Sequence, residues 1–396
     1  MIFMEEAKTV VEVNTVINSG STGHIAEDIG RASVDLGFKA YFAYGRNPKA
    51  SSLVPLKIGT KAGVCLHVLF SRLFDAHGLL STFATRRFVK KLDKIKPDIL
   101  HLHNIHGYYL NYSLLFKWIK AHDVKVIWTL HDSWSYTGHC AYYTALHCDK
   151  WMKGCGHCMG SRSYPSSLCD RSEKNWQIKR QCFTGVKDLT IVTPSLWLKE
   201  DVEKSFLQGY DVKVINNGVD TEVFKPVCHK DRDCLILGVA SVWEKRKGLE
   251  DFIAMAGLLQ PGEHIVLVGL AKEQLEQLPK GITGLCRTES QAELAALYSR
   301  ATVFVNPTYE ENFPTTNLEA LASGTPVITY EGTGSVESVS DGTGFVVKTG
   351  DVKAVMDCVR KVYKDKEGYV QSCRAKALAL YDKKLMIERY MELYKA

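Results

Sequence analysis

The chain of 396 residues lacks any uninterrupted apolar stretch long enough to span a bilayer. Its first residues also lack the basic and then apolar pattern of a signal peptide, so we expect a soluble cytoplasmic protein. No recognised nucleic-acid motif accompanies the net charge of +6, and no nucleic-acid partner is expected. The full G-x-G-x-x-G fingerprint is missing too, which argues against a dinucleotide-dependent dehydrogenase.

What the chain does contain is an ordinary globular composition, with 45% hydrophobic and 24% charged residues. At roughly 150 residues per domain, its length predicts two or three domains. Short β-rich runs alternate with segments of helical period, which predicts α/β domains with parallel sheets and crossover helices. Strands are expected at 9–14, 40–44, 99–103 and 124–130, and in a second series at 234–240, 264–268, 301–305 and 326–329.

The boundary between the two series is expected where the run 216–218 and Pro226 supply turn chemistry. We expect one doubly wound, Rossmann-like domain over residues 1–215 and a second over 216–375, followed by a helix in 376–396. Two such domains facing each other across a cleft would bind a ligand at the carboxyl ends of their strands.

Two carboxylates in E-x7-E spacing, Glu311 and Glu319, follow the expected strand at 301–305. Pro314 lies between them and suits a loop or a first helical position, so Glu311 is expected in a loop and Glu319 on a helix. The start of that helix would offer backbone N–H groups and the positive end of its dipole to a phosphate. The segment alone predicts either a diphosphate site flanked by two carboxylates or two solvated carboxylates near a helix start.

The segment from Glu311 to Ile328 closely resembles the C-terminal signature of family 4 glycosyltransferases, which have the GT-B fold. Further likenesses follow in the family's order at 20–23, 98–104, 128–132, 214–226 and 341–345, so the resemblance covers nearly the whole chain. It implies two Rossmann-like domains, with the nucleotide on the second. It also implies retaining transfer without a metal held by an Asp-x-Asp motif, and a last helix that crosses back to the first domain.

The resemblance also implies roles for the carboxylates, with Glu311 contacting the donor sugar and Glu319 the nucleotide ribose. Asn312 stands where the family more often has Gly, a departure that bears on the shape of the loop near the sugar. The residues expected to bind the donor are Gly20, Gly23, Phe313, Pro314, Thr315, Thr316 and Glu319.

Charge that builds up on a leaving diphosphate needs preorganised cations, and the run 245–248, Lys-Arg-Lys-Gly, can supply them. Lys247 resembles the phosphate-contacting lysine of the family. The family usually has an Arg five residues before that Lys, where this chain has Val242, and Arg246 is the expected substitute. A basic turn that opens a helix is the alternative interpretation of the run.

A histidine at the end of the strand at 124–130, His131, resembles the family residue that reaches the donor sugar through a hydrogen bond. The catalytic candidates are therefore His131, Lys247, Arg246 and Glu311. Polar residues at neighbouring strand ends are expected on the acceptor side: His103, Asn104, His106 and Asp132. A structural role is the alternative for any single histidine here.

Cysteines are abundant, and five of the twelve lie between 140 and 169. Cys155 and Cys158 form a C-x2-C knuckle, and Cys140 and Cys148 would complete four thiolates for a tetrahedral structural zinc. Histidines that could substitute for a thiolate are His139, His147 and His157. Because a reducing cytoplasm disfavours disulfides, free buried thiols are the alternative. This insertion, at about 139–169, is expected to shape acceptor recognition, and no cofactor is expected for catalysis.

Basic residues crowd the segment 86–96, where Phe88, Leu92 and Ile95 recur at helical spacing. Such a helix can attach to anionic lipid, which would place the protein at the inner face of a membrane. Alternatively, it docks its apolar stripe on the core and solvates its charges.

The resemblance, together with these patterns, implies a hexosyl-transferring enzyme that uses a UDP- or GDP-sugar donor. The acceptor would be a glycan or a lipid-linked glycan in the synthesis of a surface polysaccharide or related glycan. The alternatives are a GT-B-fold phosphorylase, a nucleotide-sugar epimerase, and a non-catalytic homologue that binds glycan or another transferase.

Overall fold

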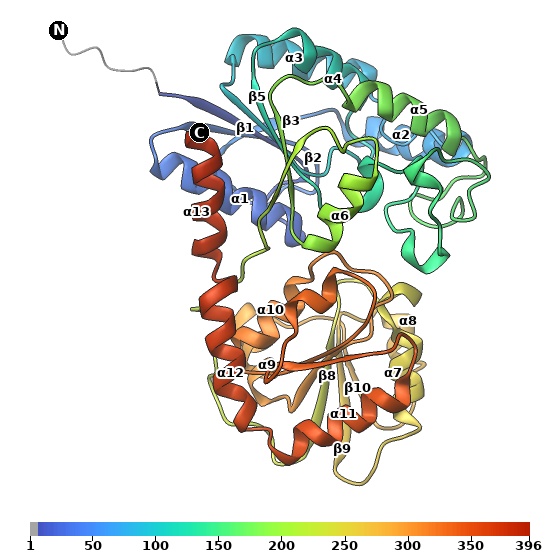
Figure 1. Ribbon diagram of the computed structural model, residues 1–396, viewed down its shortest axis with the longest axis vertical. Coiled ribbons are helices and arrows are strands. Elements are labelled where there is room, and N and C mark those ends of the chain that lie inside the picture. Colours follow the sequence, from blue (N-terminus) through green and yellow to red (C-terminus); the bar gives the residue numbers. More distant parts are fainter. Residues whose placement is uncertain (1–6) are drawn as a thin grey trace, which may run out of the picture. The chain divides into compact units, whose positions relative to one another are not determined.

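The computed structural model describes residues 7–396 and divides them into two compact units. The first unit contains residues 7–215 together with Ile387–Ala396, and the second contains Asn216–Met386. In each unit, helices surround a parallel sheet (Figure 1). The α/β, doubly wound class expected from the alternating pattern is confirmed.

The sheet of the first unit has the strand order β3-β2-β1-β4-β5-β6-β7. Its strands are β1 (Thr9–Val16), β2 (Lys39–Arg46), β3 (Val54–Lys57), β4 (Ile99–Leu102), β5 (Lys125–Thr129), β6 (Leu189–Thr193) and β7 (Asp211–Val214). All neighbours pair in parallel. The interior positions of β1 are buried on both faces, as in a parallel sheet covered by helices. The order reverses between β1 and β4, where ligands bind in folds of this kind.

Helices of the first unit follow the strands in sequence. They are α1 (Gly20–Asp35), α2 (Lys61–Phe74), α3 (Thr82–Ile95), α4 (Tyr112–Ala121), α5 (Ser172–Phe183) and α6 (Leu196–Lys204). Side-chain caps begin several of them, as where the Ser195 hydroxyl accepts the Leu198 amide at the start of α6. The basic segment forms α3, and its Phe88 and Leu92 are buried in the core of the unit. The apolar stripe of α3 therefore docks on the protein.

The cysteine-rich segment lies between β5 and α5 and contains only short 3-10 turns, at Thr144–Leu146 and Lys150–Met152. Its anchor is Trp151, which is buried and packs against the rings of Tyr136 and Tyr143. The Trp151 carbonyl accepts the indole N–H of Trp176 on α5 at 2.9 Å. Aromatic packing thus holds a segment that has almost no regular secondary structure.

The sheet of the second unit has the order β10-β9-β8-β11-β12-β13. Its strands are β8 (Cys234–Val239), β9 (Glu263–Val268), β10 (Ile282–Leu285), β11 (Val303–Asn306), β12 (Val327–Tyr330) and β13 (Gly344–Val347). Its helices are α7 (Leu249–Ala256), α8 (Lys272–Leu275), α9 (Gln291–Arg300), α10 (Thr315–Ala322), α11 (Val352–Lys364) and α12 (Gly368–Lys376). Here the order reverses between β8 and β11.

The final helix, α13 (Lys383–Lys395), follows α12 after a π-helical turn at Ala377–Tyr381. Its residues from Ile387 onward belong to the first unit, where Tyr390 and Tyr394 are buried. The Tyr390 hydroxyl forms a 3.0 Å hydrogen bond with the hydroxyl of Thr129, at the end of β5. The Lys125 ammonium donates a hydrogen bond to the Leu393 carbonyl at 2.6 Å.

Candidate active site

In the second unit, the candidate residues gather beyond the carboxyl ends of β8 and β11, where the strand order reverses. We call Arg246, Lys247, Glu311 and Glu319 the second-unit cluster. The first two lie in a 3-10 turn, Lys245–Lys247, between β8 and α7. Glu311 lies in the loop after β11, and Glu319 lies on α10, as the position of Pro314 predicts.

Gly248 lets the basic turn approach the end of β11. Its φ is +74°, and a Cβ atom there would lie 2.3 Å from the Pro307 carbonyl oxygen, so a side chain would force the two segments apart. The Arg246 carbonyl accepts the Tyr309 amide at 2.9 Å, which ties the turn to the loop that carries Glu311.

The Glu311 carboxylate forms ion pairs with both cations of the cluster. The Lys247 ammonium contacts Oε1 directly, and Nη1 of Arg246 lies 3.4 Å from the same atom. Nη1 of Arg246 also donates to the Glu310 carbonyl at 2.8 Å, which orients the guanidinium toward the loop. Val242, where the family usually has Arg, is exposed. Arg246, the expected substitute for the family arginine, thus lies against the Glu311 carboxylate.

Lys247 is a cation in a crowded position. Burial and, to a smaller extent, the neighbouring Arg246 guanidinium lower the pKa of Lys247 to about 7, against the opposing charge of Glu244. The ion pair with Glu311 acts in the opposite direction, because a carboxylate favours the charged ammonium. An anionic ligand such as a diphosphate would likewise keep Lys247 charged.

Glu319 faces a different environment on α10. Tyr298 on α9 donates its hydroxyl to Oε2 of Glu319 at 3.1 Å. Burial raises the pKa of Glu319 to about 7, although the Tyr298 hydrogen bond opposes that shift. The helix itself is anchored by the buried Asn317 side chain, which accepts from Asn306 at the end of β11 at 2.8 Å. A carboxylate that titrates near neutrality is typical of functional sites.

In the first unit, the candidates that follow β4 and β5 line one small pocket. We call them the first-unit cluster: His103, Asn104, His106, His131 and Asp132. The structure thus brings together His131 and the four residues expected on the acceptor side. Asp132 accepts from His106 at 2.9 Å and from the Trp134 amide at 3.0 Å. Although burial opposes it, the charge of His106 holds the pKa of Asp132 below its usual value.

A buried chain of hydrogen bonds leads to His131 from the sheet. Glu12, in the middle of β1, lies 3.0 Å from Nε2 of His103, and Nδ1 of His103 lies 3.1 Å from Nε2 of His131. Burial lowers the pKa of His103 to about 4 and that of His131 to about 3, so both rings are neutral at neutral pH. His103 therefore donates to the Glu12 carboxylate and accepts from His131, which leaves Nδ1 of His131 as an acceptor.

Glu12 is a functional candidate that the sequence patterns did not single out. It also accepts the Tyr394 hydroxyl at 2.5 Å and lies 3.2 Å from Nδ1 of His101. Among the His, Cys, Asp and Glu side chains of residues 7–396, one group of three or more has its possible metal-ligand atoms all within 4.8 Å of one another. It consists of Glu12, His101 and His103. Because those atoms are hydrogen-bonded to each other and to Tyr394, Thr129 and His131, we interpret the group as a polar network.

The glycines near β1 lie at the start of a helix. The run 20–23 forms the first turn of α1, with Ser19 as its N-cap, and the loop consists only of residues 17–19. The reason is that Gly20, at φ +63°, turns the chain directly into the helix. A Cβ atom at Gly23 would lie 3.1 Å from the Val16 side chain, so this glycine lets α1 begin close to the end of β1.

Among the four cysteines of the predicted zinc site, Cys140 and Cys158 have their sulfur atoms 3.7 Å apart. Neither forms a disulfide. Within the described part of the chain, no helix has both the length and the apolar content needed to cross a membrane.

Comparison with known proteins agrees with this arrangement. The sequence profile described as Glycosyltransferase Family 4 matches residues 23–223, and the profile described as Glycosyl transferases group 1 matches residues 233–365. Two parallel doubly wound units, with polar clusters at the carboxyl ends of their strands, define a glycosyltransferase of the GT-B fold. The chain belongs to glycosyltransferase family 4.

Among its relatives is a putative colanic acid biosynthesis glycosyl transferase of Escherichia coli. It is 25% identical over 368 residues, which cover 87% of this chain and 88% of the relative. A capsular polysaccharide biosynthesis glycosyltransferase of Staphylococcus aureus is 41% identical over 71 residues, 18% of this chain and 19% of the relative.

Solved structures share the fold. Sucrose-phosphate synthase from Thermosynechococcus elongatus has a TM-score of 0.75 at 16% identity and covers 98% of both chains. The Anabaena protein HepE in complex with UDP-glucose has a TM-score of 0.66 at 14% identity, over 98% of this chain and 99% of that one.

Proposed function

We propose that this glycosyltransferase moves a hexosyl group from a UDP- or GDP-sugar to a glycan or lipid-linked glycan, with retention of the anomeric configuration. The product would be a surface polysaccharide or a related glycan. The observation that carries the proposal is the second-unit cluster, in which Arg246 and Lys247 converge on Glu311 where the sheet order reverses.

The relatives support the acceptor class. The Escherichia coli and Staphylococcus aureus proteins are named for colanic acid and capsular polysaccharide biosynthesis. A Campylobacter jejuni relative, 28% identical over 182 residues that cover 44% of this chain and 47% of the relative, is named as a transferase acting on a diphospho-undecaprenol-linked sugar. The HepE structure holds UDP-glucose, which supports a nucleotide diphosphate sugar as donor.

In the proposed reaction, the cations Arg246 and Lys247 offset the charge that develops on the leaving diphosphate, the task a divalent metal would otherwise perform. The amide groups at the start of α10 add the positive end of the helix dipole. Glu311 accepts hydrogen bonds from the donor sugar and Glu319 from the ribose. His131 supplies an acceptor at Nδ1, held in that tautomer by His103 and Glu12.

The test is a donor panel of UDP- and GDP-hexoses incubated with the purified protein, with and without oligosaccharide acceptors. We expect one donor to be hydrolysed slowly without acceptor, and Glu311→Gln to reduce that rate by about 100-fold or more. The exposed Glu331→Gln serves as the matched control and should keep the wild-type rate.

Three results would separate the alternatives. A protein that binds no donor and hydrolyses none is the non-catalytic homologue. Epimerised donor without transfer identifies an epimerase, and a product whose anomeric configuration, read by NMR, is inverted overturns the retaining mechanism.

We also propose that the first unit contacts an anionic membrane surface, through a feature that the sequence patterns did not reveal. Exposed apolar side chains on α2 recur at helical spacing: Leu66, Leu69, Phe70, Leu73 and Phe74. Phe83 at the start of α3 is 77% exposed. With Arg87 and Lys91 of α3, residues of both helices line an apolar groove of about 670 Å³. Apolar residues bordered by cations suit anionic lipid headgroups.

Vesicle flotation tests this contact. We expect the wild type to float with vesicles that contain phosphatidylserine and to remain unbound with phosphatidylcholine alone. The double variant Leu69→Ser, Phe83→Ser should lose most of its binding, whereas Leu380→Ser, an exposed leucine of the second unit, should keep it. Equal binding of all three proteins would contradict the proposal.

A further inference from the structure

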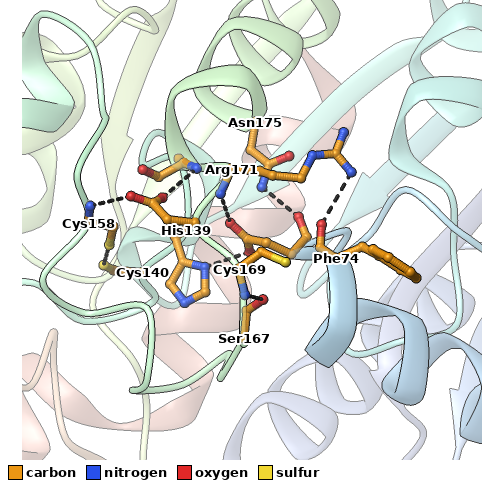
Figure 2. Close-up of polar contacts among 12 residues, drawn as sticks. Phe74, His139, Cys140, Cys158, Ser167, Cys169, Arg171 and Asn175 are labelled. Atoms are coloured by element: carbon orange, nitrogen blue, oxygen red, sulfur yellow. Dashed lines mark hydrogen bonds and ion pairs between the residues drawn. The ribbon is translucent and has the colours of Figure 1, made fainter.

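The cysteine-rich segment contains two sulfur atoms in direct contact. The sulfur atoms of Cys140 and Cys158 lie 3.7 Å apart, and Figure 2 shows these two thiols facing each other. Two thiolates bound about 2.3 Å from one tetrahedral zinc ion lie roughly 3.8 Å apart. The observed separation matches that of two ligands on one ion. It is also the distance of a thiol–thiol hydrogen bond, and it is too long for a disulfide bond.

Glycines lie close to the sulfur atoms of the cluster. The Gly138 amide donates to Sγ of Cys155 at 3.1 Å. A Cβ atom at Gly160 would lie 3.1 Å from Sγ of Cys140. Glycines therefore let the backbone approach sulfur at two points, and amide donors to sulfur stabilise the thiolate form that binds metal.

The other two cysteines of the cluster lie close by. The knuckle that carries Cys155 is held to the turn after Cys148, because the Lys150 ammonium donates to the Gly156 and His157 carbonyls, each at 3.0 Å. The segment that carries both cysteines is fixed by Trp151, whose indole N–H donates to the Cys148 carbonyl at 3.1 Å. Cys155 and Cys158 stand two residues apart in a knuckle where Gly156 and His157 both have positive φ. Four thiols from one segment thus converge on one region.

A buried cation lies beside the cluster. Lys179 of α5 is almost fully buried and donates to the carbonyls of Trp134 and Thr137, at 2.5 and 2.9 Å. Burial lowers the pKa of Lys179 to about 7, and nearby acidic groups, among them Cys155 and Asp75, oppose that shift. Four thiolates on one zinc ion carry a net charge of −2, and a buried ammonium nearby offsets part of that charge.

We propose that Cys140, Cys148, Cys155 and Cys158 bind one structural zinc ion. Within residues 7–396, no third ligand atom lies within 4.8 Å of both paired sulfurs, so Cys148 and Cys155 turn their side chains toward the pair when the ion binds.

The rival ligand is His139. Its Nδ1 is bonded to Asp75 at 2.6 Å, and its Nε2 is buried without a hydrogen-bond partner (Figure 2). A carboxylate that orients a histidine is a common arrangement behind a zinc ligand. The count of sulfur and nitrogen ligands therefore decides between the two sets.

The ion would hold the segment that follows the first-unit cluster. Gly138 and Cys140 come soon after His131 and Asp132, and the Thr137 hydroxyl donates to the Cys140 carbonyl. Cys158 is also tied to α5 through Asp170, which accepts the Cys158 amide at 2.6 Å and the Ser172 amide at 2.9 Å. A zinc ion at this point would link the end of β5 to the start of α5 in a segment with almost no regular secondary structure.

Metal analysis of the full-length protein tests the proposal without relying on transferase activity. We expect protein purified without chelators to contain about one zinc per chain, and X-ray absorption at the zinc edge to show four sulfur ligands at about 2.3 Å. Cys155→Ser should lose most of the metal. Cys169→Ser is the matched control: it lies in the same segment, but its sulfur donates to the Leu73 carbonyl, so its zinc content should be unchanged.

Several outcomes would overturn the proposal. If the wild-type protein contains little zinc and all four thiols react with an alkylating reagent, the thiols are free and no zinc is bound. A Cys140–Cys158 disulfide in non-reducing mass spectrometry excludes the site. A nitrogen ligand in the absorption spectrum rejects the four-thiolate set in favour of a set that includes a histidine. Because the spectrum needs only the wild type, misfolding of Cys155→Ser does not prevent a decision.

Discussion

Replacing Lys247 with alanine is expected to lower kcat/KM for glycosyl transfer by about 100- to 1,000-fold, the usual cost of removing one preorganised group that stabilises transition-state charge. The ammonium of Lys247 pairs with Glu311 and sits beside the Arg246 guanidinium, so its loss removes one of two cations from the place where a diphosphate would leave. Because that charge develops during reaction, we expect kcat to fall more than donor affinity.

The matched control is Lys245→Ala, which removes an exposed lysine from the same turn. Its kcat/KM should stay near the wild-type value, because a solvated charge contributes little. Steady-state kinetics with the donor found in the panel, and circular dichroism of both variants, would make the comparison. Equal losses in the two variants would contradict a specific role for Lys247.

Glu319→Gln is expected to weaken nucleotide binding by roughly 10- to 100-fold, because hydrogen bonds to a charged group contribute about 1.5–3 kcal/mol. The amide keeps the shape of the side chain and can still accept from Tyr298, so the fold should tolerate it. Isothermal titration calorimetry with UDP and GDP measures the loss. The exposed Glu276→Gln is the control and should bind as the wild type does.

The pH dependence of nucleotide binding provides a second signature of Glu319. Its folded pKa is raised to about 7, from 4.5, by burial, so the carboxyl is largely protonated in the free protein below neutrality. The free fold therefore loses some stability as pH rises from about 4.5 to 7, because over this range the carboxyl ionises in the unfolded chain but stays largely protonated in the folded one. Ribose hydroxyls donate to the ionised form, so affinity should fall by roughly tenfold from pH 8 to pH 6.

The Gln variant cannot ionise, and its weaker binding should show no such dependence between pH 6 and 8. A wild-type affinity that is constant over this range would argue against contact between the nucleotide and the Glu319 carboxylate.

Much of the fold could be predicted because its signals are local. Strands of a parallel sheet buried on both faces appear as short apolar runs, and β1, β4, β8 and β11 all fall where such runs occur. Pro314 similarly separates the loop of Glu311 from the helix of Glu319. These positions depend on backbone geometry, which the residue type itself constrains.

What the sequence did not reveal depends on contacts between distant positions. Glu12 is a single acidic residue in an apolar strand, and its link to His131 through His103 exists only because β1 and β4 are neighbours. The apolar stripe on α2 has the spacing of a core helix, and only its exposure in the structure distinguishes it. The separation of Cys140 from Cys158 likewise depends on how a long loop folds back.

The position of α13 has a consequence for synthesis on the ribosome. The buried Glu12 carboxylate accepts a hydrogen bond from the Tyr394 hydroxyl. Glu12 is translated near the beginning of the chain, whereas Tyr394 is translated only after the whole second unit. Until then the nascent first unit has an incomplete polar network around Glu12 and His101, and burying a carboxylate without its donors is costly. The second unit, whose residues are continuous in sequence, can mature earlier, so the unit that is translated first is completed last.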